Sequence, residues 1–134
     1  MRLDRPGIYV INPIEAKRIA EECRRDGWLV IFLSEEIASK DQFFDAIRVN
    51  CPLDPPLQSN RSWDALADSL WSGLDEVENE KIVIFWPDSE RMIAAESDTS
   101  VIATGIFADL CVSLADPSVT ASRAKMLLVF KIKN

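Results

Sequence analysis

The sequence contains no histidine, only three cysteines and only four glycines among its 134 residues. Without histidine, the Ser–His–Asp and Cys–His arrangements of nucleophilic catalysis are excluded, and the commonest general base at neutral pH is missing. Cys23, Cys51 and Cys111 form no CxxC pair, which excludes most zinc sites. The glycines form neither a GxGxxG nor a GxxxxGK phosphate-binding motif. We therefore expect no enzyme, no cofactor and no metal, although carboxylates, lysine and tyrosine leave a histidine-free enzyme as an alternative.

Basic residues are also scarce: 15 Lys and Arg stand against 22 Asp and Glu, which gives a net charge of −7. Nucleic-acid phosphates and anionic membrane surfaces repel such a chain, so we expect no nucleic-acid or membrane partner and favour a basic protein. Long apolar runs are missing, and the charged segment Met1–Pro6 is followed by no signal-peptide pattern. An odd number of scattered cysteines is typical of a reducing compartment. These features predict a cytoplasmic protein.

The length corresponds to a single domain with one buried core. Four short runs rich in β-branched and aromatic residues are expected to be strands, namely Ile8–Ile11, Trp28–Leu33, Lys81–Trp86 and Met126–Ile132. The middle two runs are continuously apolar, which is typical of strands buried on both faces of a parallel sheet. We therefore expect an α/β fold with a small parallel β-sheet and helices on both faces, in the order βαβααβαβ.

Four helices are expected between these strands. The first runs from Asn12-Pro13 to Asp26-Gly27, and the second from Ser39, where Gln42 completes a capping box, to about Cys51. The prolines in Pro52–Arg61 then predict an exposed, extended loop. The third helix is expected from Ser62 to about Leu74, and the fourth over approximately Ser100–Ala115, with Ala103, Phe107, Leu110, Cys111 and Leu114 facing inward.

The helix from Ser62 to Leu74 has two contrasting faces. Its expected core stripe consists of Trp63, Leu66, Ala67, Leu70 and Leu74, and its expected opposite face of Asp64, Asp68, Trp71 and Asp75. The segment from Arg61 to Glu80 contains six acidic residues and one basic residue, a local net charge of −5. Most of the negative charge of the chain is therefore concentrated on this helix and the turn after it.

The run Ser62-Trp63-Asp64-Ala65-Leu66-Ala67-Asp68-Ser69-Leu70 resembles the Asn-Trp/Leu-Asp-Ala-Leu-x-Asp-x-Leu signature of the barstar family, intracellular inhibitors of small secreted ribonucleases. Val30–Leu53 and Lys81–Trp86 are similar to the first strand and helix and to the second strand of that family. The helix containing Phe107 and the strand Met126–Ile132 complete the resemblance. It covers about three quarters of the chain, so residues 28–134 would be the family core and residues 1–27 an N-terminal addition of one strand and one helix.

The resemblance implies that the loop and the acidic helix enter a nuclease active site, where carboxylates take the place of RNA phosphates. Asp68 would reach the cationic cluster of the enzyme with Asp64 beside it. The candidate partner-binding residues are Asp64, Asp68, Trp71, Ser62, Arg61 and Asn60. The acidic contact on the last helix of the family would fall near Asp109. The family also places an aromatic residue and Gly-x-Asn before the Trp/Leu-Asp pair, whereas this chain has Gln58–Ser62 there.

We therefore expect an inhibitor or immunity protein, as in bacterial toxin–antitoxin pairs, that occludes a small guanyl-specific ribonuclease and is a monomer when free. One alternative is a barstar-fold module for a non-ribonuclease toxin or another basic protein, which the altered loop Gln58–Ser62 would explain. The other alternative is a histidine-free enzyme. The acidic face could also be a solvated surface that keeps the protein soluble, and Trp71 could belong partly to the core.

Overall fold

The computed structural model describes residues 3–120 and 123–134. Four parallel strands form one sheet in the order β1-β4-β3-β2. The strands are β1 (Gly7–Ile11), β2 (Leu29–Phe32), β3 (Lys81–Trp86) and β4 (Met126–Ile132). The expected small parallel sheet is confirmed, and every strand lies within one residue of its predicted bounds. The two central strands, β3 and β4, are the most buried, since helices cover both of their faces.

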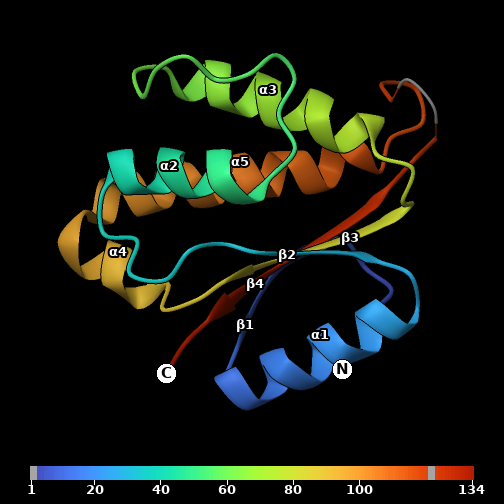
Figure 1. Cartoon of the computed structure of the whole chain (residues 1–134), viewed down its shortest axis with the longest axis horizontal. Helices are drawn as coiled ribbons and strands as arrows, with labels where there is room; N and C mark the ends of the chain where they lie inside the picture. The colour runs from blue at the N-terminus through green and yellow to red at the C-terminus, as the bar shows by residue number, and fades with distance from the viewer. Residues whose placement is uncertain (1–2, 121–122) are drawn as a thin grey trace.

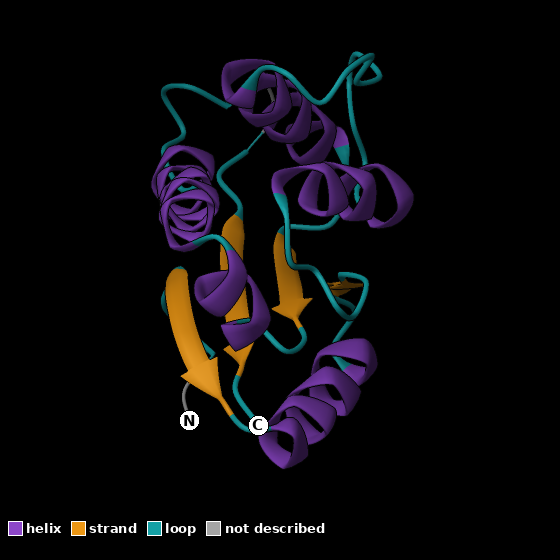
Figure 2. Cartoon of the chain, turned by 90° about the vertical axis from the view of Figure 1, so that its left-hand side faces the viewer, coloured by secondary structure: helices purple, strands orange, loops and turns teal. Residues whose placement is uncertain are grey.

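Helices lie on both sides of this sheet, as expected (Figure 1). One face is covered by α1 (Pro13–Arg25) and the other by α2 (Lys40–Asn50), α3 (Trp63–Glu76), α4 (Glu90–Ala95) and α5 (Ser97–Leu114). In both views α3 is the helix farthest from the sheet, on the outer side of α2 and α5 (Figures 1 and 2). The side of α3 that packs neither on these helices nor on the loop before it is therefore free to meet other molecules.

The two faces of the sheet bury separate apolar clusters, because alternate strand residues point to opposite sides. On one side Val83 and Phe85 pack with the inner face of α1, which is formed by Ala16, Ile19, Ala20 and Cys23. On the other side Ile82, Ile84 and Trp86 pack with residues of α2, α3 and α5. The predicted apolar face of the first helix is thus confirmed.

The N-terminal segment is built into the sheet. β1 pairs in parallel with β4, with Gly7 opposite Leu128 and Ile11 opposite Ile132. α1 then covers the second apolar cluster, which would otherwise face water. Residues 3–27 therefore supply an edge strand and one of the two helical layers.

The predicted order of elements is incomplete, because the structure has the short helix α4 between β3 and the last long helix. A helix of six residues contains fewer than two turns, too few to produce a recognisable apolar periodicity. The last helix also begins at Ser97, three residues earlier than predicted. The polar residues of its first turn carry no apolar signal that would have marked this start.

Side chains cap the first two helices. At α1, the Asn12 side chain accepts a hydrogen bond from the Glu15 backbone N–H, and the Glu15 carboxylate accepts one from the Asn12 N–H. At α2, Ser39 Oγ accepts from the Gln42 N–H at 3.1 Å, as predicted. The Gln42 side chain, however, accepts from the N–H of Ala38 at 2.7 Å rather than from the cap residue. The expected capping box is therefore displaced by one residue.

All three cysteines are buried free thiols. Burial raises the pKa of Cys51 to about 12 and is the main cause that raises the pKa of Cys23 and Cys111 to about 11. At neutral pH these side chains are therefore protonated, and they serve as small apolar groups in the core.

An acidic groove between two helices

A groove of about 410 Å³ lies between α3 and α5. It is lined by Trp63, Asp64, Ala67, Asp68 and Trp71 from α3 and by Ile102, Gly105, Ile106, Asp109, Leu110 and Ser113 from α5. We call it the acidic groove, because three aspartates are the only charged residues that line it in the described part of the chain. Two walls from helices far apart in the sequence thus form one surface feature.

The three carboxylates of the acidic groove come from both walls. Asp64 and Asp68 lie one turn apart on α3, and Asp109 is on α5. All three are exposed, and within residues 3–120 and 123–134 none of them forms an ion pair. Carboxylates four residues apart on a helix repel each other by a few tenths of a kcal/mol, although the N-terminus of α3 partly stabilises Asp64. The groove therefore concentrates negative potential that only a cationic ligand can neutralise.

Two tryptophans form the apolar part of the α3 wall. The Trp63 ring lies 5.0 Å from that of Phe44 and 5.9 Å from that of Phe43, and its other side is partly exposed in the groove. Trp63 therefore packs against the core, as expected, but the ring is only partly buried. Trp71 is half-buried and packs against the same apolar cluster, which agrees with a partial role in the core. Both rings give the groove a rigid apolar surface beside its carboxylates.

Asp75 does not belong to the exposed acidic face, contrary to the prediction. Its exposed fraction is 4%, and Gly73 and Leu74 beside it are buried as well. The loop at Pro52 passes directly over Gly73 in the second half of α3. The acidic face of α3 therefore ends at Trp71.

The loop from Pro52 to Arg61 is anchored to α3 along the second half of this helix. Ser69 Oγ donates a hydrogen bond to the carbonyl of Pro55, and the Asp54 N–H donates to the Ser69 carbonyl at 3.0 Å. At Gly73 an added Cβ atom would lie 2.8 Å from Leu53 N and closer still to the Pro52 carbonyl. Only glycine allows this close approach of the two backbones.

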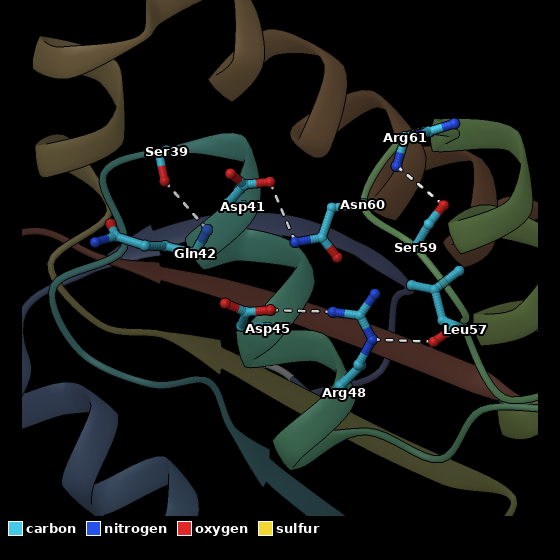
Figure 3. A network of polar contacts seen from close by, with 9 residues as sticks. All are labelled: Ser39, Asp41, Gln42, Asp45, Arg48, Leu57, Ser59, Asn60 and Arg61. Atoms are coloured by element: carbon cyan, nitrogen blue, oxygen red, sulfur yellow. Dashed lines mark hydrogen bonds and ion pairs between the residues drawn. The ribbon is translucent and has the colours of Figure 1, made fainter.

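The same loop is anchored to α2 by two basic side chains. Arg48 Nε donates to the Leu57 carbonyl at 3.1 Å while its guanidinium pairs with Asp45 at 3.0 Å (Figure 3). Lys40 Nζ donates to the Arg61 carbonyl at 2.8 Å, directly before α3 begins. The same ammonium lies 5.6 Å from the centre of the Trp63 ring. These contacts fix the start of α3 and hence the position of its first carboxylate.

The six predicted site residues fall into two groups. Asp64, Asp68 and Trp71 line the acidic groove, whereas Asn60, Arg61 and Ser62 lie on the chain that leads into α3.

The second group has mainly local contacts. Asn60 Nδ2 donates to Asp41 Oδ1 at 3.1 Å, which ties the loop to α2 (Figure 3). Ser62 Oγ accepts from the Ala65 N–H at 3.1 Å and caps the helix. The Arg61 guanidinium points away from this network and has no ion pair within the described ranges (Figure 3). Of the three, Arg61 alone offers an uncommitted charged group to a partner.

The α5 wall of the groove contains residues that the periodicity of the sequence did not identify. Asp109 joins Asp64 and Asp68, as the family resemblance suggested, and Ile102 and Ile106 add apolar surface. On sequence alone, Ile102 and Ile106 lie beside the predicted core stripe of this helix and indicate no function. Their role follows only from the placement of α3 against α5.

A larger cavity of about 550 Å³ lies at the carboxyl ends of β2 and β4, beside α1. This edge is where parallel α/β sheets often bind ligands. Its walls carry charges of both signs, including Lys17, Arg24, Glu21 and Glu35, and contain none of the predicted site residues. Within the described residues, no group of three or more Cys, Asp or Glu side chains could hold a metal ion. The acidic groove is therefore the candidate site.

The fold and the groove define a small parallel α/β domain with a negatively charged, solvent-facing helix pair. Residues 29–129, about three quarters of the chain, match the family model described as Barstar (barnase inhibitor). The chain belongs to the barstar family, and the N-terminal addition of about 27 residues precedes the matched segment. No curated protein and no solved structure gave a match to the chain. Members of this family are inhibitors rather than enzymes.

Proposed function

We propose that this protein inhibits a small, basic ribonuclease by covering its active site with the acidic groove. The observation that carries the proposal is the convergence of Asp64, Asp68 and Asp109 from two helices onto one surface. Ribonuclease active sites bind phosphate groups and are therefore cationic. Carboxylates at suitable spacing can occupy the positions of those phosphates without being substrates, so that binding alone is enough for inhibition.

Three properties of the site support this mechanism. The carboxylates have no ion pairs among the described residues, so a partner need not break existing pairs to reach them. The anchored loop holds the start of α3 in place before binding, which lowers the entropic cost of forming a complex. The net charge of −7 also speeds the encounter with a basic enzyme at low salt. We further propose that the protein acts in the cytoplasm as an immunity protein and is a monomer when free.

The test is inhibition of a panel of small guanyl-specific ribonucleases on a fluorogenic RNA. Wild type and Asp68→Ala are compared at low and at high salt. We expect Asp68→Ala to weaken inhibition by about 2 kcal/mol or more, which is the usual loss for a central charged contact. The difference should shrink as salt screens the interaction.

Asp4→Ala is the matched control, because Asp4 is an exposed aspartate outside the groove and outside the matched segment. It should change inhibition by less than about 0.5 kcal/mol, as surface substitutions commonly do. A loss of that small size for Asp68→Ala would contradict the role of α3. A wild type that inhibits no enzyme of the panel would overturn the ribonuclease assignment.

Arg61 favours a second candidate, in which the target is another basic protein. Arg61 stands two residues before α3 begins and has no ion pair among the described residues, so its uncommitted positive charge would repel a wholly cationic cleft. A partner that combines a cationic cluster with one acidic group would fit this pattern. Arg61→Glu separates the two cases, since it should strengthen binding to a wholly cationic enzyme and weaken binding to such a mixed surface.

A further inference from the structure

The helix α5 is unusually apolar for a helix with so much exposed surface. Asp98 and Asp109 are its only charged residues over the eighteen positions Ser97–Leu114. By length and composition it could cross a membrane, the single helix in the described part of the chain for which this holds, yet only 33% of it is buried. Its inner side packs in the core through Phe107 and Leu114, so the helix is already committed to the fold. An apolar helix in a soluble fold is normally covered on most sides.

The uncovered side of α5 forms one continuous stripe. Val101, Gly105, Ala108 and Val112 are all exposed and recur at intervals of four, three and four residues, which places them along one line of the helix. We call this line the α5 stripe. The valines at its ends are 69% and 74% exposed, values that leave most of each side chain in water. No charged residue interrupts the stripe over three turns.

The α5 stripe is continuous with the acidic groove. Gly105 belongs to both, and Ile102, which is 43% exposed, lines the groove next to Val101. The groove alone is lined by eleven residues, whereas a stable protein interface comprises about 20–30 residues on each side. A partner that fills the groove must therefore contact surface beyond it. On the α5 side that surface is the stripe.

We propose that the partner bound in the acidic groove also covers the α5 stripe, and that it presents aliphatic side chains beside its cationic groups. This inference rests on the proposed function. A second copy of the chain is disfavoured as the occupant. Packing two stripes together would bring Asp109 and the neighbouring carboxylates of both copies close together, and these like charges repel. A basic protein would be attracted by the carboxylates of the groove and would form apolar contacts with the stripe.

The experiment measures inhibition by the double variant Val101→Ser/Val112→Ser, using each ribonuclease that the wild type inhibits. Serine and valine have similar helix propensities, so α5 should remain folded. We expect the inhibition constant to rise about tenfold or more, and by the same factor at low and high salt, because apolar contacts are not screened. The loss caused by Asp68→Ala should instead shrink at high salt.

Val49→Ser is the matched control, since Val49 is a 79% exposed valine on α2. It should leave the inhibition constant unchanged. A double variant within twofold of wild type, while Asp68→Ala weakens inhibition, would overturn the extended interface alone and leave the ribonuclease assignment intact. A wild type that inhibits nothing would overturn both. Self-association of the wild type that the double variant abolishes would assign the stripe to a second copy and overturn the inference.

Discussion

The two helices that form the acidic groove are held in the protein by different means. α5 is held by a row of buried apolar side chains, among them Phe107 and Leu110, that reach the centre of the larger cluster. α3 also buries leucines, but its start and its outer side depend on backbone contacts with the loop from Pro52 to Arg61 and on hydrogen bonds from Lys40 and Ser69.

Because of this difference, the stability of the fold depends mainly on α5, whereas the charged face of α3 is available for binding a partner. The buried side chains that keep α5 in place also stabilise the whole domain, because they pack against the sheet. The hydrogen bonds at the start of α3 tie it to α2, and the groove side of this helix contributes little to the core beyond its tryptophans. Charged residues on α3 can therefore change with the partner at small cost to folding.

Replacing the central aromatic residue of α5 should have the largest effect. Phe107 is fully buried, and its ring lies 5.8 Å from that of Phe43 and 6.0 Å from that of Trp86. Phe107→Ala leaves a cavity and should lower the free energy of unfolding by about 3–5 kcal/mol. Denaturation by urea measures this loss. Val112→Ala on the exposed side of the same helix is the control, with an expected change within about 0.5 kcal/mol. Equal losses for both variants would show that the two sides of α5 do not differ as described.

A pair of glycine substitutions compares the two helices directly. Gly73→Ala on α3 places a Cβ atom against the Pro52 backbone and should lower the free energy of unfolding by about 1–3 kcal/mol. Gly105→Ala on α5 meets no atom within 4 Å and should raise it by about 0.5–1 kcal/mol, because alanine favours the helix. Thermal and urea unfolding of both variants show whether the free energy of unfolding falls for Gly73→Ala and rises for Gly105→Ala. A stabilising Gly73→Ala would mean that the loop does not pack on α3 as closely as the structure shows.

The smallest effect concerns pH and the anchor of the loop at the end of α3. The pKa of Glu76 is raised above its ordinary value of 4.5 by a side-chain hydrogen bond with Asp54 and by repulsion from the same carboxylate. The folded chain thus holds this proton more tightly than the unfolded chain. The free energy of unfolding therefore falls as the pH rises from about 4.5 through the folded pKa.

Glu76→Gln removes this ionisation and should flatten that part of the pH profile, so that the variant gains relative to wild type as the pH increases. Unfolding measured at several pH values between 4 and 7 gives the profile. Glu78→Gln removes an equal charge from an exposed neighbour and serves as the control. If both variants change the profile equally, the effect comes from net charge rather than from the contact between Glu76 and Asp54.

The sequence predicted the strands and the long helices well, because each has a local signal. The continuous apolar runs of β3 and the caps at Asn12 and Ser39 need no knowledge of distant residues. α4 was missed because six residues are too few for a periodic pattern. Asp75 was misplaced because helical spacing describes one helix alone, whereas burial depends on how that helix packs in the fold, where Asp75 is only 4% exposed.

The candidate site was predicted on one wall only. Asp64, Asp68 and Trp71 share a face of α3 by simple helical geometry, and the structure places all three in the groove. Asp109 lies 41 positions after Asp68, so no local pattern could join them, and only the family resemblance pointed to it. No sequence pattern predicted the apolar residues of the α5 wall, since the sequence does not distinguish an exposed aliphatic residue from a buried one.

The position of β4 between β1 and β3 affects how the protein is made. Gly7 pairs with Leu128, 121 positions later, and β4 separates β1 from β3 in the sheet order, so β1 is joined to the sheet only through β4. During synthesis, β1 therefore has no strand to pair with until Met126–Ile132 has emerged from the ribosome. Contacts of such long separation make folding slow. The groove should therefore become a stable binding surface only after translation has passed the final strand.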